Sequence, residues 1–281
     1  LAQKLFFGNH PYALSPIGSE ASLKSITQAS LLNLHKKNLK NKEVLITYCG
    51  DSSLEEVIEV LSPMFEHFTP RKAQKLLFKK YKASVGNEIF IPFNREQTQI
   101  FHGIPCGKTG SPENLYLKML TTHLSGQSSE LFVEVRDRLG LCYSAQPVHF
   151  AAIEGGYFGI YMASGHDKVV AATVAIKELL GRIKDNGLAR EDFDRIKNMI
   201  KGQNLINVQT NEDFASIYSV PVLQAQGLDY YYKGNLEIEN LKHEDFQKNI
   251  KKILSQKWNT IIVGREYKER APKASSKKKK S

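Results

Sequence analysis

The sequence lacks a long hydrophobic run. Across its 281 residues no window holds 18 consecutive apolar residues, and the N-terminal part lacks the basic stretch and apolar core of a signal peptide. We therefore expect no membrane-spanning segment. The chain begins with Leu1 rather than Met, so we expect a processed or shortened protein. The lack of a targeting sequence therefore does not indicate the cellular compartment.

Cysteine is scarce as well. The three cysteines, Cys49, Cys106 and Cys142, are far apart and include no Cys-x-x-Cys pair. From this spacing we expect neither a disulfide framework nor a zinc site with thiolate ligands. The spacing does not indicate whether the protein works in an oxidising or a reducing compartment.

The motifs of several hydrolase classes are also missing. A zinc-peptidase helix needs His-Glu-x-x-His or its inverse His-x-x-Glu-His, so that two imidazoles and a carboxylate face the metal. None of the eight histidines belongs to such a motif, and no two of them are four residues apart. The sequence also lacks a Gly-Lys-Ser/Thr phosphate loop and a Gly-x-Ser-x-Gly elbow. We expect this chain alone to bind no zinc and to hold no catalytic residue of its own.

Positive charge is concentrated at the C-terminal end. The chain has 39 Lys and Arg against 29 Asp and Glu, a net charge of +10, and residues 265–281 hold eight of the basic and two of the acidic residues. The tail therefore carries six of the ten net charges. We expect 265–281 to be a solvated, disordered tail, with weak anion contacts as the alternative and a nucleic-acid-binding module as a remote one.

Periodicity in the first part of the chain predicts helix, strand and helix. Apolar residues at helical spacing indicate a helix over 22–39, and a β-rich run indicates a strand over 44–49. Ser52 or Ser53 can cap a second helix whose first turn is acidic and which ends around 63–70.

The rest of the chain predicts one larger α+β region. Its expected elements are a strand at 97–104, a helix from 111–112 to the break at 125–129, a short helix at 131–138, strands at 143–150 and 157–163 around a turn at 154–156, a helix at 169–183 ending at Asn186-Gly187, one or two helices within 191–226, a helix at 241–254 and a strand at 258–264. This order predicts a mostly antiparallel sheet with helices on one face.

Two segments carry a family resemblance. The first is GNHPY at residues 8–12, and the second is SSELFVEVRDRLGLCYS at residues 128–144. Both resemble segments of the insulinase, or pitrilysin-type, zinc metallopeptidases (M16 family), in which a His-Pro-Tyr segment lies late in the first domain and a Ser-Ser-x-Leu-Phe…Arg…Leu-Gly-Leu-x-Tyr segment lies in the second. The likeness extends over about 1–264.

The resemblance implies a LuxS/MPP-like metallohydrolase fold with one partial and one complete domain. Residues 1–75 would be the back part of a zinc-type domain, 76–87 a linker, 88–264 a complete second peptidase-like domain and 265–281 the basic tail. In the family the inverted zinc motif and a third carboxylate ligand precede His-Pro-Tyr, and this sequence starts after both. Zinc would then belong to the missing segment or to a zinc-motif subunit, and whether this chain is an enzyme stays open.

The resemblance also assigns Arg136 and Tyr143, seven residues apart, as substrate-binding residues. In the family such a pair reaches the bound peptide and stabilises negative charge on its carbonyl oxygen while zinc activates water. The alternative interpretation is that Arg136 is a solvated helix residue and Tyr143 an ordinary sheet residue, without a role in substrate binding. Arg138 is the nearest other arginine, but its spacing to Tyr143 does not match the family pattern.

Other residues suggest weaker interpretations. We interpret His10, before Pro11, as a loop-shaping residue, His123 with Glu130 as lining a loop rather than binding a metal, and Tyr230–Tyr232 as packing against a helix.

The main function predicted by the resemblance is a portion of a zinc-dependent endopeptidase that acts on extended peptides. The alternative is a non-catalytic partner subunit of a heterodimeric peptidase. A periplasmic location is favoured by the resemblance alone.

Overall fold

The computed structural model describes residues 1–41, 44–66 and 82–266. The predicted linker, apart from 82–87, and nearly all of the predicted tail lie outside these residues. The chain divides into two compact units: one contains 1–2, 84–201 and 237–281, and the other contains 3–83 and 202–236.

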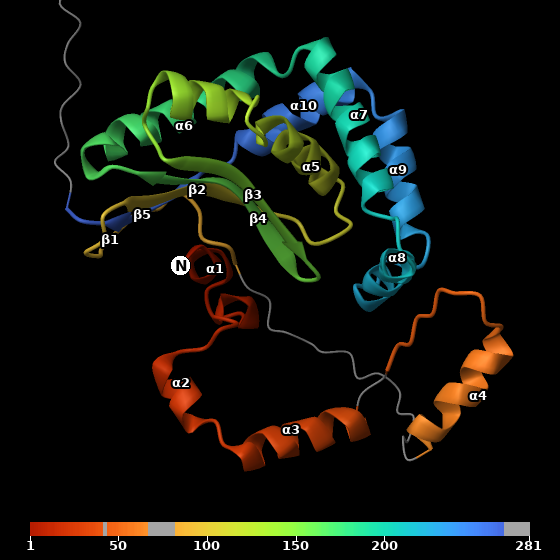
Figure 1. The fold of residues 1–281 in the computed structure, drawn as a ribbon. Coiled ribbons are helices and arrows are strands. Elements are labelled where there is room, and N and C mark those ends of the chain that lie inside the picture. The colour runs from red at the N-terminus through yellow and green to blue at the C-terminus, as the bar shows by residue number, and fades with distance from the viewer. Residues whose placement is uncertain (42–43, 67–81, 267–281) are drawn as a thin grey trace, which may run out of the picture. The chain divides into compact units, whose positions relative to one another are not determined.

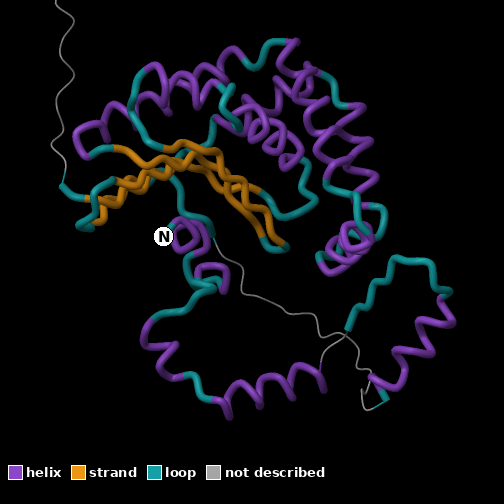
Figure 2. Tube along the Cα trace, in the orientation of Figure 1, coloured by secondary structure: helices purple, strands orange, loops and turns teal. Residues whose placement is uncertain are grey.

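The first unit is built on a five-stranded sheet (Figure 2). Its strands are β1 (Glu88–Pro92), β2 (Thr98–Cys106), β3 (Ser144–Ala152), β4 (Gly155–Ser164) and β5 (Asn259–Gly264). The order across the sheet is β1-β5-β2-β4-β3, and every neighbouring pair is antiparallel except β1 with β5. The predicted mostly antiparallel sheet is thus confirmed, together with the hairpin formed by β3 and β4.

Helices cover one face of this sheet, as Figure 1 shows for α5 (Glu113–Leu124), α6 (Val169–Asn186) and α10 (His243–Leu254). A π-helix, η2 (Leu131–Arg138), follows α5. The core lies between these layers, because β4 is buried along almost its whole length and α6 buries a stripe of residues at helical spacing. That stripe consists of Ala172, Ile176, Leu179 and Ile183.

Three further helices complete the C-terminal half: α7 (Arg190–Ile206), α8 (Asn211–Leu223) and α9 (Tyr230–Asn240). Two helices therefore occupy 191–226, as predicted. The hydroxyl of Tyr231 donates a hydrogen bond of 2.8 Å to the carbonyl of Asn204 in α7. This contact supports the interpretation of the tyrosine run as helix packing.

The first 66 residues contain α1 (Ala2–Phe7), a 3-10 turn (Pro11–Ala13), α2 (Glu20–Ser25), α3 (Gln28–Asn41) and α4 (Leu54–Phe65). The prediction of a single helix over 22–39 is wrong, because the helix is interrupted at Ile26, whose backbone is extended. Thr27 and Ser30 then cap the next helix reciprocally: each backbone amide is bonded to the other residue's hydroxyl, at 3.0 and 3.2 Å. Side-chain bonding of this kind competes with helix continuation.

The strand predicted over 44–49 is also wrong. This segment has no strand assignment, although its residues are β-branched and aromatic. Strand propensity reflects packing against neighbouring strands, and none pairs with 44–49 within the described ranges. The capped helix after it is confirmed, since Ser53 and Glu56 form a capping box at the start of α4.

Sequence reasoning also missed β1. This strand pairs with β5 along one side only, and its residues alternate between exposed and half-buried. A short edge strand of this kind has a weak sequence signal.

Gly187 ends α6 with a φ of 70°, and a Cβ there would lie 1.8 Å from Gln247 Oε1. That carboxamide is held by hydrogen bonds to the amide and carbonyl of Leu188, at 3.0 and 2.7 Å. Gly187→Ala should therefore lower the free energy of unfolding by about 1–3 kcal/mol, measured by urea denaturation.

Gly202→Ala is the matched control for this prediction. Gly202 lies in α7, and a Cβ there would meet nothing within 4 Å. We expect this variant to be more stable by about 0.5–1 kcal/mol. Equal effects of the two substitutions would contradict the assignment of Gly187.

Candidate functional site

The π-helix η2 presents Arg136. Leu131 and Val135 are buried in the core and anchor one side of η2, while Arg136 is half-buried. The amide of Leu139 donates to the carbonyl of Glu134, at 3.0 Å, in the five-residue spacing that defines a π-turn. Such turns are rare and are frequent at functional sites.

A tight connection then positions Tyr143. Gly140 adopts a φ of 57°, and its carbonyl accepts a hydrogen bond of 2.8 Å from Lys168 Nζ. The amide of Tyr143 donates to the carbonyl of Ala163 at 2.8 Å, which continues the pairing of β3 with β4. Cys142 is buried, whereas the side chain of Tyr143 is 72% exposed. The backbone of Tyr143 is therefore fixed while its ring faces solvent.

The structure brings Arg136 and Tyr143 together. The Arg136 Cζ atom lies 5.9 Å from the centroid of the Tyr143 ring and 4.5 Å from the centroid of the Phe132 ring. Both distances are within the range of cation–π attraction. Within the described part of the chain, Arg136 has no carboxylate partner and makes no hydrogen bond through its guanidinium.

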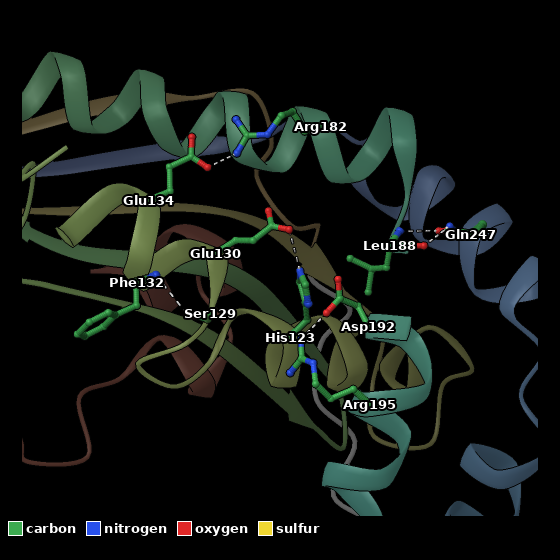
Figure 3. A network of polar contacts seen from close by, with 10 residues as sticks. All are labelled: His123, Ser129, Glu130, Phe132, Glu134, Arg182, Leu188, Asp192, Arg195 and Gln247. Carbon is green, nitrogen blue, oxygen red and sulfur yellow. Dashed lines mark hydrogen bonds and ion pairs between the residues drawn. The ribbon is translucent and has the colours of Figure 1, made fainter. Parts of the chain in front are cut away.

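Arg138 is placed differently. Its guanidinium lies 3.2 Å from Glu134, whose other carboxylate oxygen pairs with Arg182 of α6 (Figure 3). Arg138 is thus held in an ion-pair network on the surface of η2. The two arginines thus differ in their partners as well as in their spacing from Tyr143.

A second polar pair lies at the start of η2. His123 Nε2 is 3.7 Å from Glu130 Oε1, a separation that suits an electrostatic contact and is too long for a hydrogen bond (Figure 3). His123 is buried in the last turn of α5, directly before the loop that leads to Glu130. The His123 imidazole lowers the pKa of the Glu130 carboxyl, against the opposing effect of partial burial.

The described residues do not fit a zinc site. No three His, Cys, Asp or Glu side chains among residues 1–41, 44–66 and 82–266 gather closely enough to hold a metal ion. His10 instead receives a hydrogen bond of 3.2 Å from the Tyr12 amide at its Nδ1, with extended backbone before Pro11. This contact supports its loop-shaping interpretation.

Sequence reasoning missed the part played by Phe132. It lies four residues before Arg136, a spacing that places side chains on one side of a helix, and its ring lies against the guanidinium. The same spacing was available in the sequence as a signal.

Among all the residues that the structure describes, no helix is both long and apolar enough to cross a membrane.

The sheet, its helical layer and the Arg136–Tyr143 pair define a mixed α+β protein with a polar site beside one edge strand. Residues 25–200 match the family described as "Peptidase M16 inactive domain". The chain therefore belongs to the M16 peptidase family, as the two motifs predicted.

Similar proteins share sequence or fold with most of this chain. An uncharacterized zinc protease of Rickettsia bellii is 22% identical over 92% of this chain and 62% of its own length. A crystal structure of a peptidase M16 inactive domain from Pseudomonas fluorescens has a TM-score of 0.82 with 19% identity, covering 95% of this chain and 64% of that one. A protease from Helicobacter pylori has a TM-score of 0.78 with 17% identity, covering 94% and 65%. The chain thus spans less than two thirds of these relatives.

The lowered pKa of Glu130 predicts a pH-dependent contribution to stability. A carboxyl whose pKa is lowered by folding stabilises the protein above its unfolded pKa, and this contribution is lost as the pH falls through the folded value. Glu130→Gln should therefore lower the free energy of unfolding at pH 7. We expect less than about 1 kcal/mol, because the side chain is 47% exposed.

Urea midpoints at pH 7 and at about pH 3 measure this effect, since carboxyl groups are largely protonated at the lower pH. The difference between Glu130→Gln and the parent protein should shrink at the lower pH. Glu178→Gln, on the exposed face of α6, is the control and should change little at either pH. A destabilisation by Glu130→Gln that is equal at both pH values would contradict the pairing.

Proposed function

We propose that Arg136 and Tyr143 form the substrate half-site of a zinc-dependent endopeptidase of the M16 family. The observation that carries this proposal is that the Arg136 guanidinium lies beside the exposed ring of Tyr143 and, in the described part of the chain, has no carboxylate partner. Arg138, by contrast, is paired with Glu134.

The geometry suits a peptide carbonyl group. A guanidinium offers several N–H donors in a fixed plane, and a phenol hydroxyl offers one more. Both donors can approach the same oxygen, where negative charge develops during hydrolysis, and donors held in advance stabilise that charge. Phe132 contributes by keeping the guanidinium against its ring, so that less side-chain freedom is lost when substrate binds.

The metal would come from elsewhere. Because the residues described here do not fit a zinc site, zinc and the catalytic base belong, in this proposal, to the part of the relatives that this chain does not span or to a separate zinc-motif subunit. Residues 1–75 would then be the back part of the zinc-type domain, and 88–264 a complete second domain of the LuxS/MPP-like fold. The zinc supplies the Lewis acid, and this chain binds and orients the peptide.

A non-catalytic subunit is the second candidate. It is favoured by the match of residues 25–200 to the family described as "Peptidase M16 inactive domain". The two candidates differ in one measurable property, because an activity-supporting chain raises hydrolysis by a zinc-motif partner and a purely structural one does not.

The test is reconstitution of the full 281-residue chain with a zinc-motif M16 subunit from the same source cells. Hydrolysis of an internally quenched peptide should rise above that of either component alone and should disappear with a chelator. Complex formation without any gain in hydrolysis would overturn the half-site proposal and leave the structural subunit.

In the reconstituted complex, Arg136→Ala should lower kcat by about 10²–10³-fold, the usual effect of removing one donor to a developing oxyanion. Tyr143→Phe, which removes only the hydroxyl, should lower kcat in the same direction. Steady-state kinetics measures both.

Arg138→Ala is the matched control, because Arg138 lies two residues away on η2 but is engaged by Glu134. It should change kcat by less than about threefold, as expected for an exposed ion pair. The half-site assignment fails if Arg138→Ala reduces kcat as much as Arg136→Ala while both variants still assemble.

A further inference from the structure

A groove of about 420 Å³ opens on the helix-covered side of the sheet, within the first unit. One wall is α6, the other is the end of α10 with the residues that follow it, and the floor is formed by β1, β5 and β2. Its lining includes Glu88, His102, Lys177, Gly181, Lys184 and Trp258. The proposed peptidase role uses none of these residues.

The floor is a row of three polar residues across adjacent strands. Glu88 is in register with Thr260, and Thr260 is in register with His102. His102 Nδ1 lies 2.9 Å from the Thr260 hydroxyl, and its ring stacks on Trp258 with centroids 4.7 Å apart and planes 11° from parallel. The imidazole is therefore fixed in position.

His102 is an unusual residue for a sheet interior. Burial lowers its pKa to about 4, with a further lowering by Lys177, so the ring is neutral at pH 7. Nε2 has no hydrogen-bond partner among residues 1–41, 44–66 and 82–266. In the tautomer in which Thr260 donates to Nδ1, Nε2 carries the proton and can donate to a ligand oxygen.

The α6 wall has room beside it. Lys177, Gly181 and Lys184 are spaced at four and three residues, which places them on one side of the helix. A Cβ at Gly181 would meet nothing within 4 Å. Glycine inside a helix is less favourable than alanine, and packing does not require it here. The missing side chain at Gly181 leaves this part of the groove open.

The charged lining is positive overall. Lys177 and Lys184 face one carboxylate, Glu88, which lies 2.9 Å from Lys177. Among the residues that the structure describes, Lys184 pairs only with the exposed Asp185, at 3.4 Å, and it lines the groove. The carbonyl of Leu254, in the last turn of α10, accepts a hydrogen bond of 3.0 Å from Trp258 Nε1, so this acceptor is already engaged.

We propose that this groove binds a carboxylate carried on an aromatic or apolar body. Lys184 and the Nε2 proton of His102 contact the carboxylate, and Trp258 with Leu180 contacts the body. The carboxylate can belong to a small free acid or to the C-terminus of a peptide, since both present the same group. The proposal is independent of the peptidase role.

The single tryptophan of the chain gives a direct readout, because Trp258 lines the groove. The full chain is titrated with phenylacetate, with N-acetylphenylalanine and with N-acetylphenylalanine amide while tryptophan fluorescence is followed. Both acids should give a saturable change, and the amide should bind at least about tenfold more weakly, because it lacks the charge. Tighter binding of N-acetylphenylalanine than of phenylacetate identifies a peptide C-terminus, and the reverse order identifies a free acid.

Two variants locate the site. Gly181→Leu fills the groove and should weaken binding at least about tenfold, while Gly202→Leu, on α7 and also facing open space, should not. Lys184→Gln should weaken binding by about tenfold, and Lys184→Arg should restore most of it. Circular dichroism verifies folding. Equal binding of acid and amide, or binding unaffected by Gly181→Leu in a folded protein, would overturn the proposal.

Discussion

Burial of one face of the central strands β2 and β4 beneath α5, α6 and α10 is the constraint on which the rest of the first unit depends. Ile100 and Ile104 from β2 and Phe158 and Ile160 from β4 are almost completely buried in this layer. Because α6 and α10 must cover these residues, their positions on the sheet are fixed, and the loops that join them to the strands are fixed in turn.

The candidate site follows from that packing. Leu131 and Val135 extend the core into η2, so the π-helix cannot turn freely, and its outer side carries Arg136 toward Tyr143. The core thus sets the geometry of a polar site in which neither member is itself buried. The arginines differ in their electrostatic partners. Glu134 forms ion pairs with Arg138 and Arg182, while Arg136 lies against the rings of Phe132 and Tyr143.

The helices α2 and α4 show the opposite situation. The helices α2, α3 and α4 have sound local signals, including two capping boxes, yet no residue of α2 or α4 is buried. Local sequence therefore determines helix formation there without determining a core. Helix caps and propensity contribute within one element, whereas burial requires a second surface.

The sequence by itself determined the element order from β2 to β5 apart from α9, the stop at Gly187, a cap at Ser52 or Ser53 and the membership in the M16 family, because each depends on local spacing or on a long motif. Only tertiary structure decided that 44–49 has no paired strand, that β1 lies beside β5 and that Phe132 and Tyr143 flank Arg136. It also placed His102 of β2 against Trp258 near β5, a contact between residues far apart in the chain. The physical reason is that strand pairing and side-chain contacts across the sheet depend on which distant segments meet. Periodicity along the chain does not show which segments these are.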